Sequence, residues 1–239
     1  MKKIMFSERY GLEQAVLAGT KTMTRRLMIM TLHRRNKYGQ MVKVEPNEMF
    51  IASDGTAHFK FGDKSYAVPK ENQPSYHVGE EVAIAQPYKN DDVLAYNAYN
   101  EDGTAREDGL QRHKEMLGSK GYRNKMFVKA EYMPHRIRIT GIKVERLQDI
   151  SEEDCLQEGV LKAPFDGFHV TGIGMTVPKS MARPIGQTAD GKPVYGDRYR
   201  DFKYDTPREA FAALIDRISG RGTWQSNPWV YAYTFELIK

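Results

Sequence analysis

Cysteine is nearly absent from this sequence, which contains one such residue, Cys155, among 239. A single cysteine cannot form an internal disulfide, and it excludes the paired Cys-x-x-Cys ligands of thiolate metal sites. No apolar run approaches the roughly 18 residues that a membrane-spanning helix needs, and no export signal is visible near the N-terminus. We therefore expect a cytoplasmic protein, without a membrane partner, whose core is held by packing alone.

Motifs for metals and nucleotide cofactors are also missing. The six histidines lie far apart and include no His-x-x-x-His pair, so we expect no metal site. The sequence has no Gly-x-x-x-x-Gly-Lys-Thr loop and no Gly-x-Gly-x-x-Gly turn after a strand, and Gly-x-Ser-x-Gly is absent as well. The usual fingerprints of nucleotide-cofactor folds are therefore lacking, and we expect no cofactor.

Acidic residues are fewer than basic ones, with 31 Asp and Glu against 36 Lys and Arg. The resulting net charge of +5 favours an anionic partner, because a basic surface attracts phosphate through long-range Coulomb forces. With 40% apolar and 28% charged residues, the composition is otherwise that of an ordinary globular protein, and its length suits one elaborated domain.

Helix and strand signals both occur along the chain. Helices are predicted where an apolar stripe at helical spacing has start and stop residues, at 8–18, 105–117, 151–159 and 206–220. Strands are predicted at 21–26, 82–85, 126–144 with a bulge at Gly141, and 229–237, with a small antiparallel meander over 37–68. Residues 162–205 are rich in Gly and Pro without a sustained period, which predicts a long loop, either a functional flap or poorly ordered.

The chemically densest stretch is Gly19-Thr20-Lys21-Thr22-Met23-Thr24-Arg25-Arg26, directly after the first predicted helix. A lysine can remove the proton of a hydroxyl if burial or a neighbouring positive charge lowers its pKa from about 10.4. Lys21 and Thr24 are therefore a candidate nucleophile pair, although their spacing requires a turn or bulge because residues three apart lie on opposite faces of a flat strand. The alternative is a solvated basic segment at the end of a helix.

Basic and aromatic side chains along the chain are candidate nucleic-acid contacts. Guanidinium and ammonium groups suit phosphate oxygens, and aromatic rings stack on bases. The predicted contacts are Lys21, Arg25, Arg26, Arg136, Trp224 and Trp229, and Arg34-Arg35 extends the basic inventory. The alternative is that the arginine stems cover apolar surface and that the C-terminal aromatic residues belong to the core.

Four segments carry a family resemblance. They contain Leu-Ala-Gly-Thr-Lys-Thr-Met-Thr-Arg-Arg, Val-Gly-Glu-Glu-Val-Ala-Ile-Ala-Gln, Ile-Ser-Glu-Glu-Asp-Cys-Leu-Gln-Glu-Gly and Gly-Thr-Trp-Gln-Ser-Asn-Pro-Trp, within residues 4–26, 76–86, 133–159 and 222–237. Together they resemble the ASCH domain, a branch of the PUA-like superfamily. The resemblance implies one α+β domain over residues 1–239, in which a mixed or antiparallel β-barrel carries short helices on its outside. Two polar regions, at about 31–75 and 162–205, look like insertions.

The same resemblance implies a function linked to RNA or modified nucleosides, in a cleft beside the Gly-x-Lys-Thr segment. The first expectation is a binding protein for nucleic acid or a modified nucleoside. Small bacterial relatives remove the acetyl group from acetylcytidine with a Lys, a Thr and a Glu, and Lys21, Thr24 and Glu158 match those positions. One alternative is therefore an amidohydrolase in which Lys21 activates Thr24 and Glu158 serves the leaving amine. A second is a protein-interaction module that docks a partner on residues 162–205.

Overall fold

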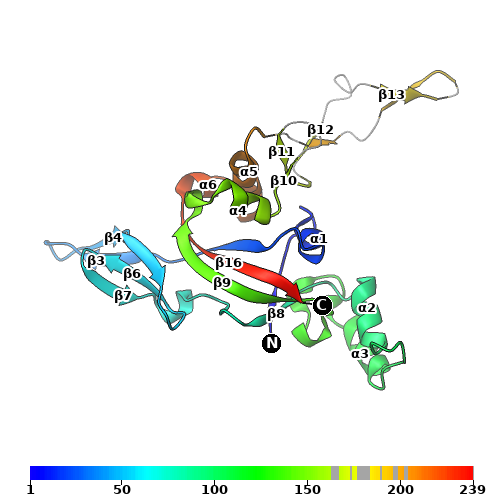
Figure 1. Cartoon of the computed structure of the whole chain (residues 1–239), viewed down its shortest axis with the longest axis horizontal. Coiled ribbons are helices and arrows are strands. Elements are labelled where there is room, and N and C mark those ends of the chain that lie inside the picture. Colours follow the sequence, from blue (N-terminus) through cyan, green and yellow to red (C-terminus); the bar gives the residue numbers. More distant parts are fainter. Residues whose placement is uncertain are drawn as a thin grey trace.

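The central element of the fold is a mixed five-stranded sheet. The computed structural model describes residues 1–162, 167–172, 174–176, 184–188, 190–195, 199–201 and 204–238. The strands follow the order β1-β8-β9-β16-β2, comprising β1 (Lys2–Ile4), β8 (Glu81–Ile84), β9 (Arg136–Arg146), β16 (Trp229–Ile238) and β2 (Met23–Leu27) (Figure 1). β1 and β8 run parallel, whereas the other neighbouring pairs are antiparallel.

The long strands β9 and β16 pair along their whole lengths. Their register shifts between Thr234 and Phe235, which leaves Thr140 as the extra residue of a β-bulge. The predicted bulge at Gly141 is thus confirmed. A Cβ atom on Gly141 would lie 2.6 Å from the hydroxyl of Thr234, which explains why glycine stands beside the bulge.

The central sheet is open, and the closed barrel implied by the resemblance is not formed by the described residues. Closure requires the two edge strands to exchange hydrogen bonds. Here the edges are β1, with three residues, and β2, with five, and no pairing between them occurs in the described part of the chain. The described residues therefore form a mixed α+β fold with several antiparallel sheets.

The polar region at 31–75 forms its own antiparallel structure, as its turn signals predict. It consists of a hairpin, β3 (Leu32–Arg35) with β4 (Met41–Val44), and a three-stranded sheet, β5 (Glu48–Ile51), β6 (Ala57–Phe61) and β7 (Lys64–Ala67). In Figure 1 these strands project from one side of the central sheet. Met49, Ala57, Phe59 and Val68 are buried in the main core, so this region is anchored to the rest of the protein.

The region at 162–205 contains short strand pairs where the sequence predicts a loop without regular structure. The pairs are β10 (Leu161–Lys162) with β11 (Phe168–His169), β12 (Gly174–Thr176) with β15 (Tyr199–Asp201), and β13 (Pro184–Gln187) with β14 (Pro193–Tyr195). Backbone pairing satisfies amide and carbonyl groups without an apolar period, which explains why composition alone did not reveal these strands. Residues 163–166, 173, 177–183, 189, 196–198 and 202–203 of the proposed flap or partner-docking loop lie outside the described part of the chain.

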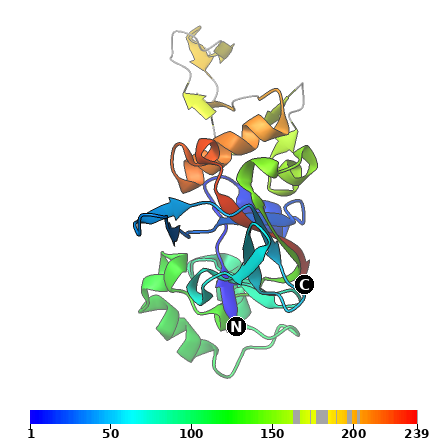
Figure 2. The same cartoon turned by 90° about the vertical axis from the view of Figure 1, so that its left-hand side faces the viewer.

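Helices cover both ends of the sheet. They are α1 (Leu12–Leu17), α2 (Asp91–Ala98), α3 (Gly109–Leu117), α4 (Glu152–Gln157), α5 (Pro207–Ser219) and α6 (Thr223–Ser226). Short 3₁₀ turns occur at η1 (Lys70–Asn72), η2 (Lys120–Tyr122), η3 (Lys125–Phe127), η4 (Ala130–Tyr132) and η5 (Leu147–Asp149). Figure 2 shows α5, in orange, beyond one end of the central sheet and the green α2–α3 pair beyond the other. No helix among the described residues has the length and apolar character needed to cross a membrane.

The predicted caps of α4 and α5 are confirmed. The hydroxyl of Ser151 accepts a hydrogen bond from the backbone N–H of Asp154 at 3.0 Å, and Thr206 accepts one from Glu209 at 3.2 Å. These bonds satisfy N–H groups that the first turn of a helix leaves free. The two residues that predicted these helix starts therefore form the capping hydrogen bonds themselves.

Other boundaries differ from the predictions. The first helix begins at Leu12 and not at residue 8, because Gly11 has a φ of 64° and starts the helix after a turn. The helix predicted from residue 105 begins at Gly109, and α2 was not predicted, although Asn90 caps it. The alternating apolar residues from 126 to 130 do not form a strand but lie in and between two 3₁₀ turns. Val128 and Ala130 pack into a second, smaller core with residues of α2 and α3, whereas Met126 is exposed.

Candidate functional site

Lys21 lies buried in the short connection between α1 and β2. Its backbone N–H donates to the carbonyl of Ala15 at 3.0 Å, which holds the residue against the end of the helix. The ammonium donates three hydrogen bonds of 2.7 Å each, to the carbonyl oxygens of Met23 and Glu158 and to Oε2 of Glu158. Since an ammonium group has three N–H donors, this geometry is that of a protonated lysine with all of its donors satisfied.

Glu158 follows the last residue of α4 and is 4% exposed. Its two carboxylate oxygens accept from different cations, Oε2 from Lys21 and Oε1 from Nη1 of Arg25 at 3.2 Å. The next residue, Gly159, has a φ of 103°, and a Cβ there would lie 2.8 Å from Leu12. Glycine is therefore needed at position 159, where the chain leaves α4 directly after Glu158.

Thr24 lies on β2 opposite Tyr233 of β16 and is 6% exposed. It lines the same cavity as Lys21 and Glu158. Among the described residues, no hydrogen bond joins its hydroxyl to Lys21, whose donors are already engaged. Lys21 and Thr24 would lie on opposite faces of a flat strand, but β2 begins only at Met23. Lys21 therefore lies in the connection before the strand, and both side chains line the same cavity.

Arg25 lies between three carboxylates and is not directed to solvent. Its side chain is 1% exposed and its guanidinium contacts Glu145 and Asp154 at 2.6 Å and Glu158 at 3.2 Å. Lys143 also contacts Asp154 and Glu145, at 2.9 and 3.0 Å. We call the whole set the ion-pair network, formed by Lys21, Arg25, Lys143, Glu145, Asp154 and Glu158. Three basic and three acidic groups give it a formal charge of zero.

Burial lowers the pKa of Lys21, because desolvation disfavours the charged ammonium. The carboxylate of Glu158 opposes this shift through its charge and its hydrogen bond, whereas Arg26 and Arg25 add to it. The pKa of Lys21 therefore lies below that of an exposed lysine, and its proton is easier to remove. The 2.7 Å contact provides Glu158 as the nearest acceptor for that proton.

The cavity beside these residues has a volume of about 190 Å³. Its polar side is formed by Lys21, Thr24, Glu158 and Arg26, and its apolar wall includes residues of α5, namely Phe211, Leu214 and Ile215. The helical period predicted these α5 residues as core, so no sequence signal distinguished the part of the stripe that borders a cavity. The volume is below the range of roughly 300–1,000 Å³ typical of drug-sized ligands, so the cavity suits a small group of a larger substrate.

Three of the predicted nucleic-acid contacts lie away from this cavity. Trp229 packs against the core with the guanidinium of Arg146 4.4 Å from its ring, and its indole N–H is buried with no hydrogen-bond partner among the described residues. Trp224 packs edge-on against Phe211 at 6.2 Å between ring centroids. Arg136 begins β9, at the opposite end of that strand from Arg146. The structure thus brings together Lys21, Thr24, Arg25, Arg26 and Glu158, and it does not bring Arg136, Trp224 or Trp229 to them.

Comparisons with protein-family models, curated proteins and solved structures found no match to this chain. The described residues also contain no group of His, Cys, Asp and Glu side chains arranged to hold a metal ion. Interpretation of the cavity therefore depends on its own chemistry.

Proposed function

We propose that this protein is an amidohydrolase that removes an N-acyl group from a modified nucleoside of the acetylcytidine type, with Lys21, Thr24 and Glu158 as its catalytic residues. The observation that carries the proposal is the buried 2.7 Å contact between Lys21 and Glu158, beside a cavity that Thr24 also lines. These residues are separated by up to 137 positions in the chain. Perturbed lysines paired with a carboxylate in a cavity are frequent features of catalytic centres.

The charge balance of the ion-pair network supports a neutral substrate. A phosphate placed beside Glu158 would add negative charge to a buried cluster whose acidic and basic groups already match. An N-acyl nucleoside is uncharged at its amide and avoids this cost. The buried position of Arg25 likewise favours a role in holding Glu158 over direct contact with a nucleic-acid backbone.

The chemistry follows from the two hydrogen-bonded groups. Transfer of one proton from Lys21 to Glu158 gives a neutral amine and a carboxylic acid. The amine then takes the proton of Thr24 while the Thr24 oxygen attacks the acyl carbon, and Glu158 gives its proton to the leaving nitrogen as the C–N bond breaks. This step leaves an acyl ester on Thr24 and restores the original charges of Lys21 and Glu158. After the same transfer from Lys21 to Glu158, water attacks the ester and gives one proton to the Lys21 amine, while Glu158 protonates the departing Thr24 oxygen. The acyl group leaves as a carboxylic acid, which loses its proton to solvent.

The direct test is hydrolysis of N4-acetylcytidine by the purified protein, followed by chromatography of the cytidine released. We expect Thr24→Ala to abolish turnover and Glu158→Gln to lower it by about 10²–10⁴-fold, since proton transfer contributes about that much. Thr20→Ala is a matched control, because the Thr20 side chain is exposed and its hydroxyl donates to the backbone carbonyl of Ala15, away from the cavity. All variants are compared after circular dichroism confirms that they are folded.

Two results would contradict the proposal. Activity that survives in Thr24→Ala would remove Thr24 as the nucleophile. Binding of the nucleoside without any turnover by the wild-type protein would leave a binding protein, which is the other function expected from the resemblance.

A further inference from the structure

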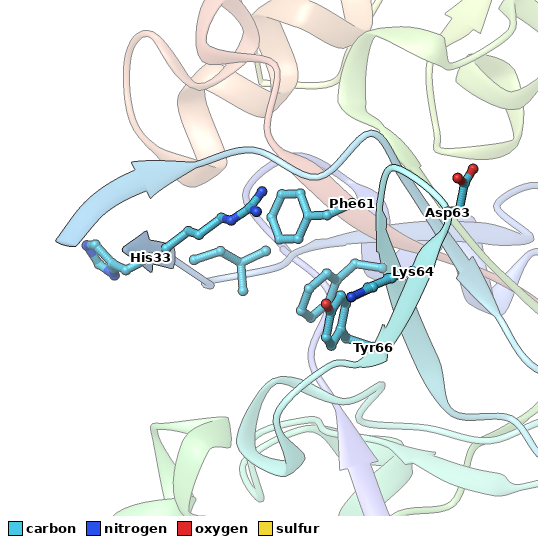
Figure 3. Close-up of a pocket in the computed structure, with 8 residues that line it drawn as sticks. His33, Phe61, Asp63, Lys64 and Tyr66 are labelled. Carbon is cyan, nitrogen blue, oxygen red and sulfur yellow. The ribbon is translucent and has the colours of Figure 1, made fainter. Parts of the chain in front are cut away.

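A second cavity, with a volume of about 510 Å³, lies in the region at 31–75. It is bordered by strands β3, β6 and β7, and Figure 3 shows the side chains of Phe61, Lys64 and Tyr66 grouped on one side of it. Its lining residues are Leu32, His33, Arg34, Phe59, Phe61, Asp63, Lys64 and Tyr66. The volume falls within the range of about 300–1,000 Å³ that ligand sites commonly have.

Three aromatic rings form one wall of this cavity. Phe59 and Tyr66 lie opposite each other on β6 and β7 and stack with centroids 5.6 Å apart. Phe61 meets Phe59 edge-on at 5.6 Å and Tyr66 at 6.5 Å. Phe59 is buried, whereas Tyr66 is 46% exposed, so the cluster offers an accessible ring on a rigid apolar base. A partly exposed ring held in this way is suited to stacking on a planar ligand.

Among the described residues, the cations of this cavity have no ion-pair partners, in contrast to those of the ion-pair network. Arg34 and Lys64 are exposed, and neither forms an ion pair within the described part of the chain. Asp63 is the one carboxylate in the lining, and in Figure 3 its side chain points away from the rings. The adjacent β3–β4 hairpin is also basic, since residues 32–44 include four Lys and Arg residues and no Asp or Glu. The positive charge is thus available to an anion from outside.

We infer that this cavity is a binding site for single-stranded nucleic acid, in which a base stacks on Tyr66 and the neighbouring phosphates contact Arg34 and Lys64. Rings and unpaired cations side by side match a nucleotide, whose base is planar and whose phosphate is anionic. An apolar peptide would leave the cations unmatched, and free phosphate would leave the rings unused. A duplex keeps its bases stacked inside, so the strand must be single. The inference goes beyond the proposed function and stands or falls independently of the Lys21 cavity.

The test uses fluorescence anisotropy of the full-length protein with a labelled, single-stranded RNA of about 12 nucleotides, and with DNA of the same sequence. We expect Tyr66→Ala to weaken binding by about 5- to 150-fold, the range for loss of one stacked base. The double variant Arg34→Ala/Lys64→Ala is expected to flatten the slope of log affinity against log salt concentration by about 1.4, because each lost single-strand phosphate contact contributes about 0.7.

Matched controls come from the opposite side of the molecule. Tyr99→Ala removes a ring that is 55% exposed at the end of α2, and Lys114→Ala removes an exposed cation of α3. Both are expected to bind like the wild type. Hydrolysis of acetylcytidine, measured on the same Tyr66→Ala sample, reports separately on the other cavity.

Three results would overturn the inference. One is absence of binding at about 50 mM salt, where phosphate contacts are strongest. Another is equal loss of affinity in the Tyr66 and Tyr99 variants, which would show that the cavity is not the contact. The third is a ligand other than a single strand that binds equally well. This would be shown if AMP competed as effectively as the unlabelled oligonucleotide at equal molar concentration, or if a duplex bound with the affinity of the single strand.

Discussion

The interaction between Lys21 and Glu158 can be measured by a double-mutant cycle of protein stability. Both side chains are almost fully buried, at 1% and 6% exposure. Removing one partner of a buried ion pair costs about 3–5 kcal/mol, because the remaining charge is left without compensation. Lys21→Met and Glu158→Gln are therefore each expected to lower the free energy of unfolding by about that amount. For a chain of this length, the melting temperature falls by roughly 6–20 °C.

The structure also indicates how the two variants differ. In Lys21→Met, Glu158 keeps its contact with Arg25, but the carbonyls of Met23 and Glu158 lose their donor, at about 1–3 kcal/mol for each unsatisfied group. In Glu158→Gln, Lys21 keeps both carbonyls and loses its counter-ion. The double variant removes both charges together, so its loss should be smaller than the sum of the single losses by about 1–3 kcal/mol.

The assay is urea unfolding near neutral pH, followed by the fluorescence of the protein's two tryptophans. The control cycle uses Lys60→Met and Glu48→Gln, whose ion pair at 2.9 Å is 38% and 55% exposed. Surface pairs of this kind couple by about 0.2–1 kcal/mol. If the Lys21 and Glu158 losses add to within about 0.5 kcal/mol, the two groups are not coupled and the proton-transfer argument for the cavity fails.

Three further predictions concern the elements that hold the candidate site. Gly159→Ala should lower stability by about 1–3 kcal/mol in urea unfolding, because its φ of 103° disfavours a side chain and the added Cβ meets Leu12; unchanged stability would contradict this. Burial raises the pKa of the Cys155 thiol to about 12, so the folded protein should react with a thiol reagent at mildly alkaline pH only after urea unfolds it, and rapid reaction beforehand would be the contrary result. The pKa of Asp154 is lowered: burial opposes the shift, but hydrogen bonds from Lys143 and Arg25 outweigh it. A carboxyl group whose pKa is lowered by folding stabilises the folded protein at pH values above its unfolded pKa, and this stabilisation is lost as the pH falls. The urea midpoint should therefore drop between about pH 5 and pH 3, and it should drop by less in Asp154→Asn. Equal drops in the two proteins would contradict this role of Asp154.

Local signals in the sequence anticipated those elements whose causes are local. Ser151 and Thr206 cap α4 and α5 as predicted, because a hydroxyl and the N–H three residues later are close in any helix start. The apolar run of β8 is buried inside the sheet as expected. Failures arose where packing decided the outcome, as with Val128 and Ala130, which lie in or beside 3₁₀ turns and pack into the core that also holds residues of α2 and α3. Propensity cannot distinguish a strand from turns that bury the same residues.

The sequence by itself determined the α+β character, the caps, the bulge beside Gly141 and the chemical types Lys, Thr and Glu at positions 21, 24 and 158. Tertiary structure alone decided that Lys21 contacts Glu158 and that the sheet stays open. It also decided that Arg25 is enclosed by carboxylates while Arg34 and Lys64 remain unpaired in the described part of the chain. The physical reason is that the kind of chemical group on a side chain is fixed by the residue type and can be read from the sequence. Its solvation and its partners depend on segments that are distant in the sequence and meet only after folding.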